Sequence, residues 1–354
     1  MKFRNPSSDF FTVLKDRVYN YFREKNKKPT GNVTLYTKAV VLLTLLISGY
    51  VLLVFFTPAS AWISLSIAAM MGLLMGAIGF NVMHDGAHGS YSGNKTVNAV
   101  MASTLNLLGG STFMWKQKHN MAHHTFTNVE GADDDIDIKP FIRVSPDQKH
   151  YWFHRFQHYY GFFLYGFTYL FWVFYNDFNK YFLRRISDNA PLKKMNIREH
   201  IGFWLTKIVY LFTFIILPSL QVGFWYAMAG YGVAVFVCGF VIALVFQLAH
   251  IHQEAEFPTP NPETDQIEND WAIHQLHTTA NFATRNMFLS WLLGGLNFQV
   301  DHHLFPKISH IHYPAISKII KETCQEYNIS YKEFPTLFSA IRSHLMYLKK
   351  AGMA

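Results

Sequence analysis

Charged residues are scarce in this chain of 354 residues. Asp, Glu, Lys and Arg make up 15% of it, against roughly a quarter in soluble proteins. Residues 39–58, 59–83 and 208–249 carry no charged side chain. A hydrocarbon core about 30 Å thick needs about 20 apolar residues per helix, so four transmembrane helices fit in these stretches. The composition excludes an ordinary soluble protein and predicts an all-α integral membrane protein.

Cysteine is also scarce. Cys238 and Cys324 are the only two, which excludes a disulfide framework. The first 38 residues lack the apolar core and small-residue cleavage site of a signal peptide. They contain apolar residues at helical spacing behind a possible cap at Ser8 or Asp9, namely Phe10, Phe11, Leu14, Val18, Tyr21 and Phe22. This segment is expected either on the membrane surface or against the protein's own cytosolic part.

Basic residues are missing from the two short turns between the expected spans. All but one of the 31 Lys and Arg residues lie in 1–38, 81–202 and 250–354. Because Lys and Arg that flank a span resist translocation, both termini and the long central segment are expected in the cytoplasm. This topology explains the formal net charge of +8, so we expect no nucleic-acid partner.

We expect one domain, 1–354. Its parts are an amphipathic segment at 1–36, spans one and two at 37–83, a cytosolic segment at 84–202, spans three and four at 203–249, and a cytosolic segment at 250–354. Pro58 marks the turn of the first hairpin, and Pro218 with Gly223 breaks the second. In-plane helices are expected in three uncharged or aromatic stretches, at 96–115, 156–175 and 287–298.

Histidines form three clusters. In order they are His84 and His88; His119, His123 and His124; and Gln299, His302 and His303. His84 and His88 lie four residues apart and so project from one helix face towards one metal. The second cluster repeats this spacing and adds an adjacent imidazole, directed about 100° round the helix, which can reach a second metal. His250, at the end of span four, is an eighth candidate ligand.

The clusters predict two metal ions, because seven or eight histidines exceed one coordination sphere. Imidazole suits Fe, Zn, Cu and Ni, so the ligands alone do not choose the metal. No Glu has a His three residues later, which sets this site apart from the carboxylate di-iron bundles. His154 with His158 repeats the four-residue spacing and is interpreted as ordinary interfacial packing, and His274 with His277 form another candidate pair.

The segments HDGAH, HNMAHHTFTN and FQVDHHLFP resemble the three histidine boxes of the membrane fatty acid desaturase family, in order and spacing. Gln299 in place of the first histidine of the third box resembles the front-end branch. The resemblance implies four spans in two hairpins, a cytosolic helical cap, a di-iron centre, and O2 as the oxidant that introduces a cis double bond into an acyl chain. The ligands it implies are His84, His88, His119, His123, His124, His250, His302 and His303.

The same resemblance implies roles for neighbouring residues. Gln299, Asp85 and Asp301 are possible ligands or partners of ligands, as are Asp133 to Asp137, where DDDI resembles the family's acidic element. Phe113, Trp115 and Phe298 are candidates for the wall of an acyl tunnel. The bond is expected at a delta-5 or delta-6 position of an acyl-CoA or acyl-lipid.

Electrons are expected from a separate ferredoxin or cytochrome b5-type protein, because the chain has no His-Pro pair and hence no haem motif of a fused cytochrome b5 domain. Basic residues at 116, 118, 184, 185, 193 and 194 are candidates for docking that donor. The same absence, with that of a targeting signal, favours a bacterial inner membrane.

Two other functions compete with desaturation. Membrane hydroxylases and ketolases share the boxes and differ in product. A histidine-rich metal transporter is the more distant alternative. Transporters place polar ligands inside their spans near the midplane, whereas the three boxes of this chain lie outside the expected spans.

Overall fold

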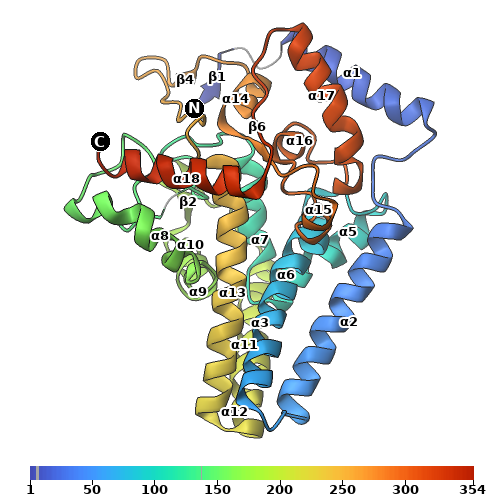
Figure 1. The fold of residues 1–354 in the computed structure, drawn as a ribbon, viewed down its shortest axis with the longest axis vertical. Helices are drawn as coiled ribbons and strands as arrows, with labels where there is room; N and C mark the ends of the chain where they lie inside the picture. The colour runs from blue at the N-terminus through green and yellow to red at the C-terminus, as the bar shows by residue number, and fades with distance from the viewer. Residues whose placement is uncertain (5–7, 137) are drawn as a thin grey trace.

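Four long apolar helices stand side by side in the lower half of the computed structural model, which describes residues 1–4, 8–136 and 138–354 (Figure 1). The helices long and apolar enough to cross a membrane are Val33–Phe55, Ala61–His88, Ile197–Val222 and Phe224–His250. The predicted four spans are therefore confirmed as candidates by length and composition. Both chain ends lie in the upper part of Figure 1, away from the α12 turn at the bottom.

The first two candidate spans are joined by the short segment 56–60, which contains Pro58. They are α2 (Val33–Phe55) and α3 (Ala61–Ile78), and α3 continues through a π-helical turn, η1 (Gly79–Met83), into α4 (His84–His88). The helix ends at Gly89, whose φ of 78° suits glycine. It therefore passes the expected boundary at Met83, and the first histidine cluster lies on its last turn, on a helix as the spacing predicts.

The other two candidate spans reverse direction at a single glycine. The third consists of α11 (Ile197–Leu211), the π-helical η5 (Phe212–Ile216) and α12 (Leu217–Val222), and the fourth is α13 (Phe224–His250). Pro218 does not break the third helix, which continues past it to Val222. The π-helical turn just before Pro218 is a common way to accommodate a local disruption of the helical ladder. The chain turns at Gly223, where φ is 89°.

Close backbone packing joins α13 to α3 and to the chain at Gly166. A Cβ atom on Gly72 would lie 2.3 Å from the carbonyl oxygen of Ala234, and one on Gly239 would lie 2.6 Å from that of Gly166. Small residues allow such approaches between membrane helices. The core beside these contacts includes Met71, Met75 and Cys238, all buried.

The stretches expected to lie in-plane contain only short helices within the described residues. These are α5 (Lys95–Ala102), α6 (Thr104–Leu107), α7 (Thr112–Lys116), α8 (Gln157–Tyr165), α9 (Thr168–Phe171), the π-helical η4 (Trp172–Asn176) and α15 (Met287–Leu292). The connecting elements are η2 (Gln117–His123), η3 (Trp152–Phe156), α10 (Asp177–Leu183), α14 (Trp271–Thr278), α16 (Gln299–Leu304) and η6 (His310–His312).

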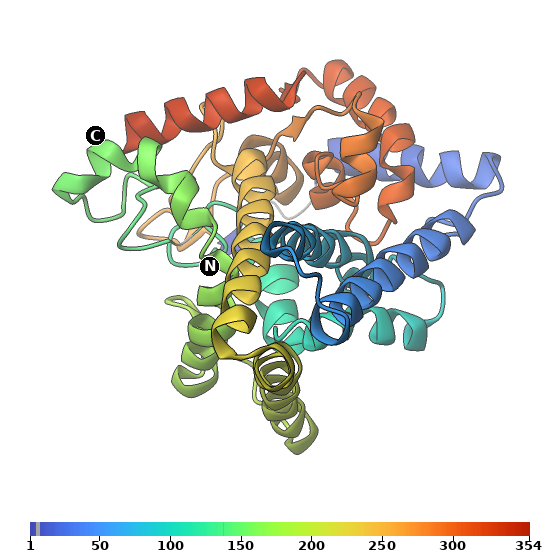
Figure 2. The same ribbon diagram turned by 60° about the horizontal axis from the view of Figure 1, so that its bottom comes forward.

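Three further helices lie above the spans, α1 (Asp9–Glu24), α17 (Tyr313–Glu326) and α18 (Leu337–Ala351), with α18 crossing the upper end of α13 (Figures 1 and 2). Ser8 caps α1 by accepting a hydrogen bond from the Phe11 N–H. The apolar face of α1, which includes Leu14 and Val18, is buried in one cluster with Ile316 and Ile320 of α17. Of the two expected placements of this segment, packing against the protein itself is therefore the one observed.

Strands are few and short. In the part of the chain that the structure describes they form three two-stranded sheets: β1 (Lys2–Phe3) parallel to β4 (Gln266–Ile267), β2 (Arg185–Ser187) antiparallel to β3 (Ala190–Pro191), and β5 (Asn281–Phe282) parallel to β6 (Glu333–Phe334). They fasten loops, so the expectation of a mainly helical fold holds.

Candidate metal centre

Histidines from four separate elements face one another at the upper end of the spans. They come from α4 (His84, His88), η2 and its C-cap (His119, His123, His124), the last residue of α13 (His250) and α16 (His302, His303). All eight predicted ligands are thus brought together, although the first and last are 219 positions apart. Four of them, His123, His250, His302 and His303, have no exposed surface.

The imidazoles divide into two groups. In the first, one nitrogen from each of His84, His88, His119 and His302 lies within 4.8 Å of the others, and in the second the same holds for His123, His250 and His303. His124 lies between the groups, with its ring centre 4.6 Å from that of His302 and 4.4 Å from that of His303. A third, overlapping group joins His119 and His123 to Asp135. The first two groups consist of imidazoles alone and are compatible with the expected pair of metal ions.

The nitrogen positions suit metal ligation. Imidazole binds first-row metals at about 2.1 Å, so two neighbouring ligands of one ion lie roughly 3.0–3.4 Å apart. Nε2 of His123 is 3.2 Å from Nε2 of His303, and Nε2 of His119 is 3.2 Å from Nε2 of His124. Nε2 of His88 and Nε2 of His302 are buried with no hydrogen-bond partner among the described residues. Such orphaned acceptors are costly unless something binds them.

A π-helical turn distributes the second cluster differently from the expected pattern. The His124 N–H donates to the His119 carbonyl five residues earlier, at 3.0 Å. This brings Nε2 of His124 to 3.2 Å from Nε2 of His119, whereas His123 belongs to the second group. The spacing argument paired His119 with His123 on one metal, because it assumed an α-helix.

Outer hydrogen bonds orient most of these rings. Two rings are held by carboxylates: Nδ1 of His123 lies 2.8 Å from Asp133, and Nδ1 of His119 lies 3.2 Å from Asp135. Two others are held by neutral groups: Nδ1 of His302 lies 3.1 Å from the Tyr313 hydroxyl, and Nδ1 of His303 lies 2.7 Å from the Gln275 amide oxygen. Each bond uses the nitrogen away from the group and leaves Nε2 free to bind a metal. Trp115 stacks on His119 with ring centres 4.4 Å apart.

Electrostatics keep most of the imidazoles neutral. Burial lowers the pKa of His302 and His303 well below the usual value, and neighbouring imidazoles lower it further. Burial also lowers the pKa of His119 to about 4, against the opposing effect of Asp135. At His123 burial is outweighed by the Asp133 carboxylate, which raises the pKa. Neutral imidazole is the form that binds metals.

Gln299 faces the second group. Its amide nitrogen is 3.0 Å from Nε2 of His250 and 3.4 Å from Nε2 of His303. The side chain therefore reaches the same point as two candidate ligand atoms.

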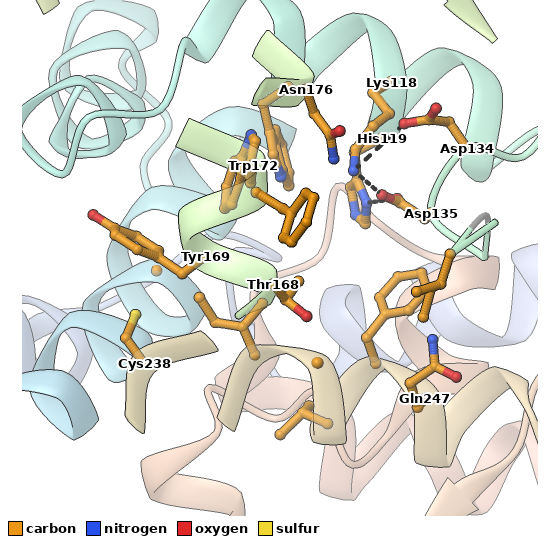
Figure 3. Close-up of a pocket in the computed structure, with 18 of the residues that line it drawn as sticks. Lys118, His119, Asp134, Asp135, Thr168, Tyr169, Trp172, Asn176, Cys238 and Gln247 are labelled. Carbon is orange, nitrogen blue, oxygen red and sulfur yellow. Dashed lines mark hydrogen bonds and ion pairs between the residues drawn. The ribbon is translucent and has the colours of Figure 1, made fainter. Parts of the chain in front are cut away.

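A cavity of about 440 Å³ adjoins the first group and extends between the candidate spans (Figure 3). Its wall includes His84, His119 and Gln299 at one end and Met75 and Cys238 farther along the helices. Among the predicted tunnel residues, Trp115 lines it. Phe113 packs in a different cluster with Met114 and Phe203, and Phe298 packs with α1 and α17.

Comparison with known proteins places this arrangement in a family. Residues 57–335 match the family described as Fatty acid desaturase. The chain is 38% identical to the sn-1 linoleoyl-lipid 6-desaturase of Synechocystis sp., covering 98% of this chain and 96% of that protein. It is 37% identical to the Acyl-lipid (8-3)-desaturase of Physcomitrium patens, with coverages of 98% and 72%, and 31% identical to the Delta(5) fatty acid desaturase A of Dictyostelium discoideum, with coverages of 98% and 75%. This chain belongs to the fatty acid desaturase family. It is an oxidoreductase that desaturates fatty acyl chains, as the three boxes predicted.

Two predicted carboxylates of the desaturase contact groups other than its box histidines. Asp85 accepts from the Ser309 hydroxyl at 2.8 Å and lies 3.1 Å from Nδ1 of His310. Asp301 accepts from the Asn281 amide at 2.8 Å. Any role of these two carboxylates at the metals is therefore indirect. Asp133 and Asp135 make the contacts expected of that region, and Asp137 lies outside the described residues.

Sequence reasoning missed two ring partners, Gln275 and Tyr313, because neither has a fixed spacing to a box. Neither of the two further histidine pairs belongs to the histidine groups: His154 bonds the Pro140 carbonyl, and His277 bonds Glu256. Of the basic docking candidates, Lys118 forms an ion pair with Asp135, whereas 184, 185, 193 and 194 are exposed.

Proposed function

We propose that this desaturase holds two iron ions, one in each histidine group, and uses O2 to introduce a cis double bond into an acyl-lipid. The convergence of eight histidines into two groups beside a cavity between the spans carries this proposal. When bound, the irons supply the redox chemistry by which O2 removes two vicinal hydrogens. The protein residues hold the ions, exclude water and position the acyl chain.

The ligands of the first ion are His84, His88, His119 and His302, and those of the second are His123, His250 and His303, with His124 between them. Gln299 directs its amide at the second ion. Asp133, Asp135, Tyr313 and Gln275 fix the ring orientations by hydrogen bonds to Nδ1, which keeps each Nε2 lone pair directed inward.

The new bond is placed between an existing double bond and the carboxyl end. The similar proteins of Synechocystis sp. and Dictyostelium discoideum are named 6- and delta-5 desaturases, and Gln299 matches the front-end pattern. Two of the relatives reported above are named for lipid-bound substrates, which favours an acyl-lipid over an acyl-CoA.

The histidine groups and both chain ends lie on the cytoplasmic side. The four spans form two hairpins below a cytosolic cap, and the membrane is a bacterial inner membrane. The basic residues at 1–38, 81–202 and 250–354 support this orientation. A separate ferredoxin or cytochrome b5-type protein supplies electrons, and the exposed basic residues at 184, 185, 193 and 194 are the candidates for its docking.

A hydroxylase or ketolase would use the same ligands, so the product decides. Expression in a desaturase-deficient host, followed by gas chromatography–mass spectrometry of its fatty acids, should detect a new cis double bond near the carboxyl end. The bond should vanish in the His302→Ala/His303→Ala variant and persist in His277→Ala, whose histidine lies outside both groups. Hydroxylated product, or no product from iron-loaded protein supplied with a donor, would refute the proposal.

A further inference from the structure

The cavity beside the first histidine group opens at the protein surface. Among the described residues of its wall, the exposed ones all belong to two segments: Lys139, Pro140 and Phe141 in one, and Phe171 and Tyr175 of α9 and η4 in the other. The remaining wall residues are buried or half-buried. The two segments approach each other at Phe141 and Phe171, whose ring centres lie 6.5 Å apart. The opening between them is termed the mouth.

The surface around the mouth is aromatic. Phe141, Phe171 and Tyr175 are 46%, 49% and 58% exposed, and Phe163 on α8 and Phe174 on η4 are exposed as well. Large apolar side chains are seldom exposed to water in a contiguous patch, and aromatic residues gather where a membrane protein meets the lipid headgroups. In Figure 1 the helices α8, α9 and α10 lie beside the upper part of α13 and below the crossing helix α18. The composition and position of the mouth therefore suit the surface of a bilayer better than water.

The mouth adjoins the first histidine group. Tyr175 is followed by Asn176, which lines the cavity and lies beside His119 in Figure 3. Beyond the histidines the wall follows α3 and η1 from His84 back to Met75, nine residues or about 13 Å. An extended chain of C–C bonds of about 1.5 Å advances roughly 1.25 Å per carbon, so about ten carbons fit along this part. Only a short stretch of acyl chain then lies between the histidines and the mouth, as a new bond near the carboxyl end requires.

We propose that the acyl chain of a membrane lipid enters this cavity sideways from the bilayer, between Phe141 and Phe171, while its headgroup stays at the membrane surface. This inference rests on the proposed acyl-lipid function. A headgroup that stays at the surface avoids the cost of burying a charge. An acyl-CoA would instead bring phosphate groups, which bind to cations. Among the described residues of the mouth the one cation, Lys139, is already ion-paired with Glu130 at 2.7 Å.

Photo-crosslinking from the acyl chain tests this route without turnover. Full-length, iron-loaded protein in phosphatidylcholine vesicles, with no electron donor, receives a phosphatidylcholine whose sn-1 acyl chain carries a diazirine near its methyl end. After irradiation, peptide mass spectrometry should find the label on Met75 or Leu108, which are buried at the far end of the cavity. Val40, an exposed residue of α2, contacts lipid in any case and is the reference for labelling from the bilayer. The same chain supplied as a CoA thioester should label the far end less.

The mouth can be closed reversibly in the same protein. In a background of Cys238→Ala and Cys324→Ala, the variant Phe141→Cys/Phe171→Cys is bridged by a short bifunctional thiol reagent that a reductant releases. Bridging should abolish labelling of the far end and leave Val40 labelled, and the reductant should restore labelling of the far end.

The matched control is Phe182→Cys/Trp204→Cys, treated in the same way. Its two ring centres are also 6.5 Å apart, and both side chains are exposed outside the cavity wall, so its bridge should leave labelling of the far end unchanged. Phe171→Ala widens the mouth without a bridge and should speed that labelling.

Three outcomes would overturn the inference. They are labelling of the far end that persists in the bridged Phe141→Cys/Phe171→Cys protein, labelling by the acyl-CoA and not by the lipid, and a labelling rate of Phe171→Ala equal to that of the wild type. The measurement records entry of the chain and not the product. A hydroxylated product would therefore refute the proposed function and leave this inference standing.

Discussion

Asp133 provides a sharp test of the proposed iron sites. Its Oδ2 atom lies 2.8 Å from Nδ1 of His123 and accepts from the Asn128 N–H at 2.9 Å, while its Oδ1 atom accepts from the Asp135 N–H at 3.0 Å. Both oxygens of this buried carboxylate therefore accept hydrogen bonds. Asn at this position has only one accepting atom, so Asp133→Asn must set its NH2 group against at least one donor.

Either orientation of the new amide weakens the second iron site. With the oxygen toward His123, the NH2 group meets the Asp135 N–H, and the segment carrying it must shift. With the NH2 group toward His123, Nδ1 must accept, which moves the ring proton to Nε2 and blocks the atom directed at the metal. Loss of such an outer contact typically costs 10–100-fold in metal affinity, which is about 1.4–2.7 kcal/mol.

The change in metal affinity can be measured by incubating the protein with increasing concentrations of a chelator and determining the retained iron by mass spectrometry. Asp133→Asn should lose one iron at a chelator concentration about 10–100-fold lower than the wild type and release the other later, because in the first group only His119 is held by the neighbouring Asp135, whereas His302 is held by Tyr313. Asp188→Asn removes an exposed carboxylate whose contact is with Arg185 and is the matched control. Release curves identical to those of the wild type would refute the assigned role of Asp133, and simultaneous loss of both irons would refute two separable sites.

Three stability predictions concern regions away from the irons. Lys207→Met should lower the free energy of unfolding by about 3–5 kcal/mol, measured by thermal unfolding. In the wild type the buried Asp177 carboxylate lies 2.7 Å from Lys207 Nζ, and the substitution leaves this carboxylate without its cation. Gly72→Val should cost about 1–3 kcal/mol, because its Cβ would lie 2.3 Å from the Ala234 carbonyl oxygen. Burial lowers the pKa of His344 to about 4 from an ordinary 6.5. The neutral side chain therefore contributes up to about 3 kcal/mol to the free energy of unfolding above pH 6.5, and this contribution is lost as the pH falls toward 4. The free energy of unfolding of His344→Gln should depend less on pH in that interval.

The first two of these predictions have a control variant. Lys194→Met removes an exposed cation and should leave the unfolding temperature nearly unchanged. Gly72→Ala tests the same contact with the smallest side chain and should destabilise less than valine. The pH reasoning fails if His344→Gln and the wild type lose stability equally between pH 6.5 and 4. The packing reasoning fails if Gly72→Val unfolds at the same temperature as the wild type.

The span assignment could be predicted because it rests on the absence of charge. Uncharged stretches located four candidate spans, but hydropathy reports where polar residues resume and not where the backbone ladder ends. The helix of span two therefore continues to His88, five residues beyond the expected end at Met83. Of the two residues predicted to break the second stretch, only Gly223 marks the turn, because the helix continues through Pro218 to Val222.

The candidate ligands were predictable because each box is local in sequence, and their outer partners were not. Gln275 reaches His303 from α14, and Tyr313 reaches His302 from the start of α17. Both contacts depend on how separate helices dock, which single-sequence spacing does not encode. Aromatic residues near the boxes were poor guides to the cavity for the same reason, since only Trp115 of the three candidates lines it.

The division of the second box shows what the spacing rule assumes. A four-residue spacing puts two histidines on one face only where the helix has 3.6 residues per turn. In η2 the hydrogen bonds span five residues, so His119 pairs with His124 and His123 turns toward the other group. A strict α-helix would place His119 and His123 on one face and turn His124 toward the second group. The extra residue in this turn therefore changes which of the two adjacent histidines faces the second group, and the one short segment still supplies candidate ligands to both proposed irons.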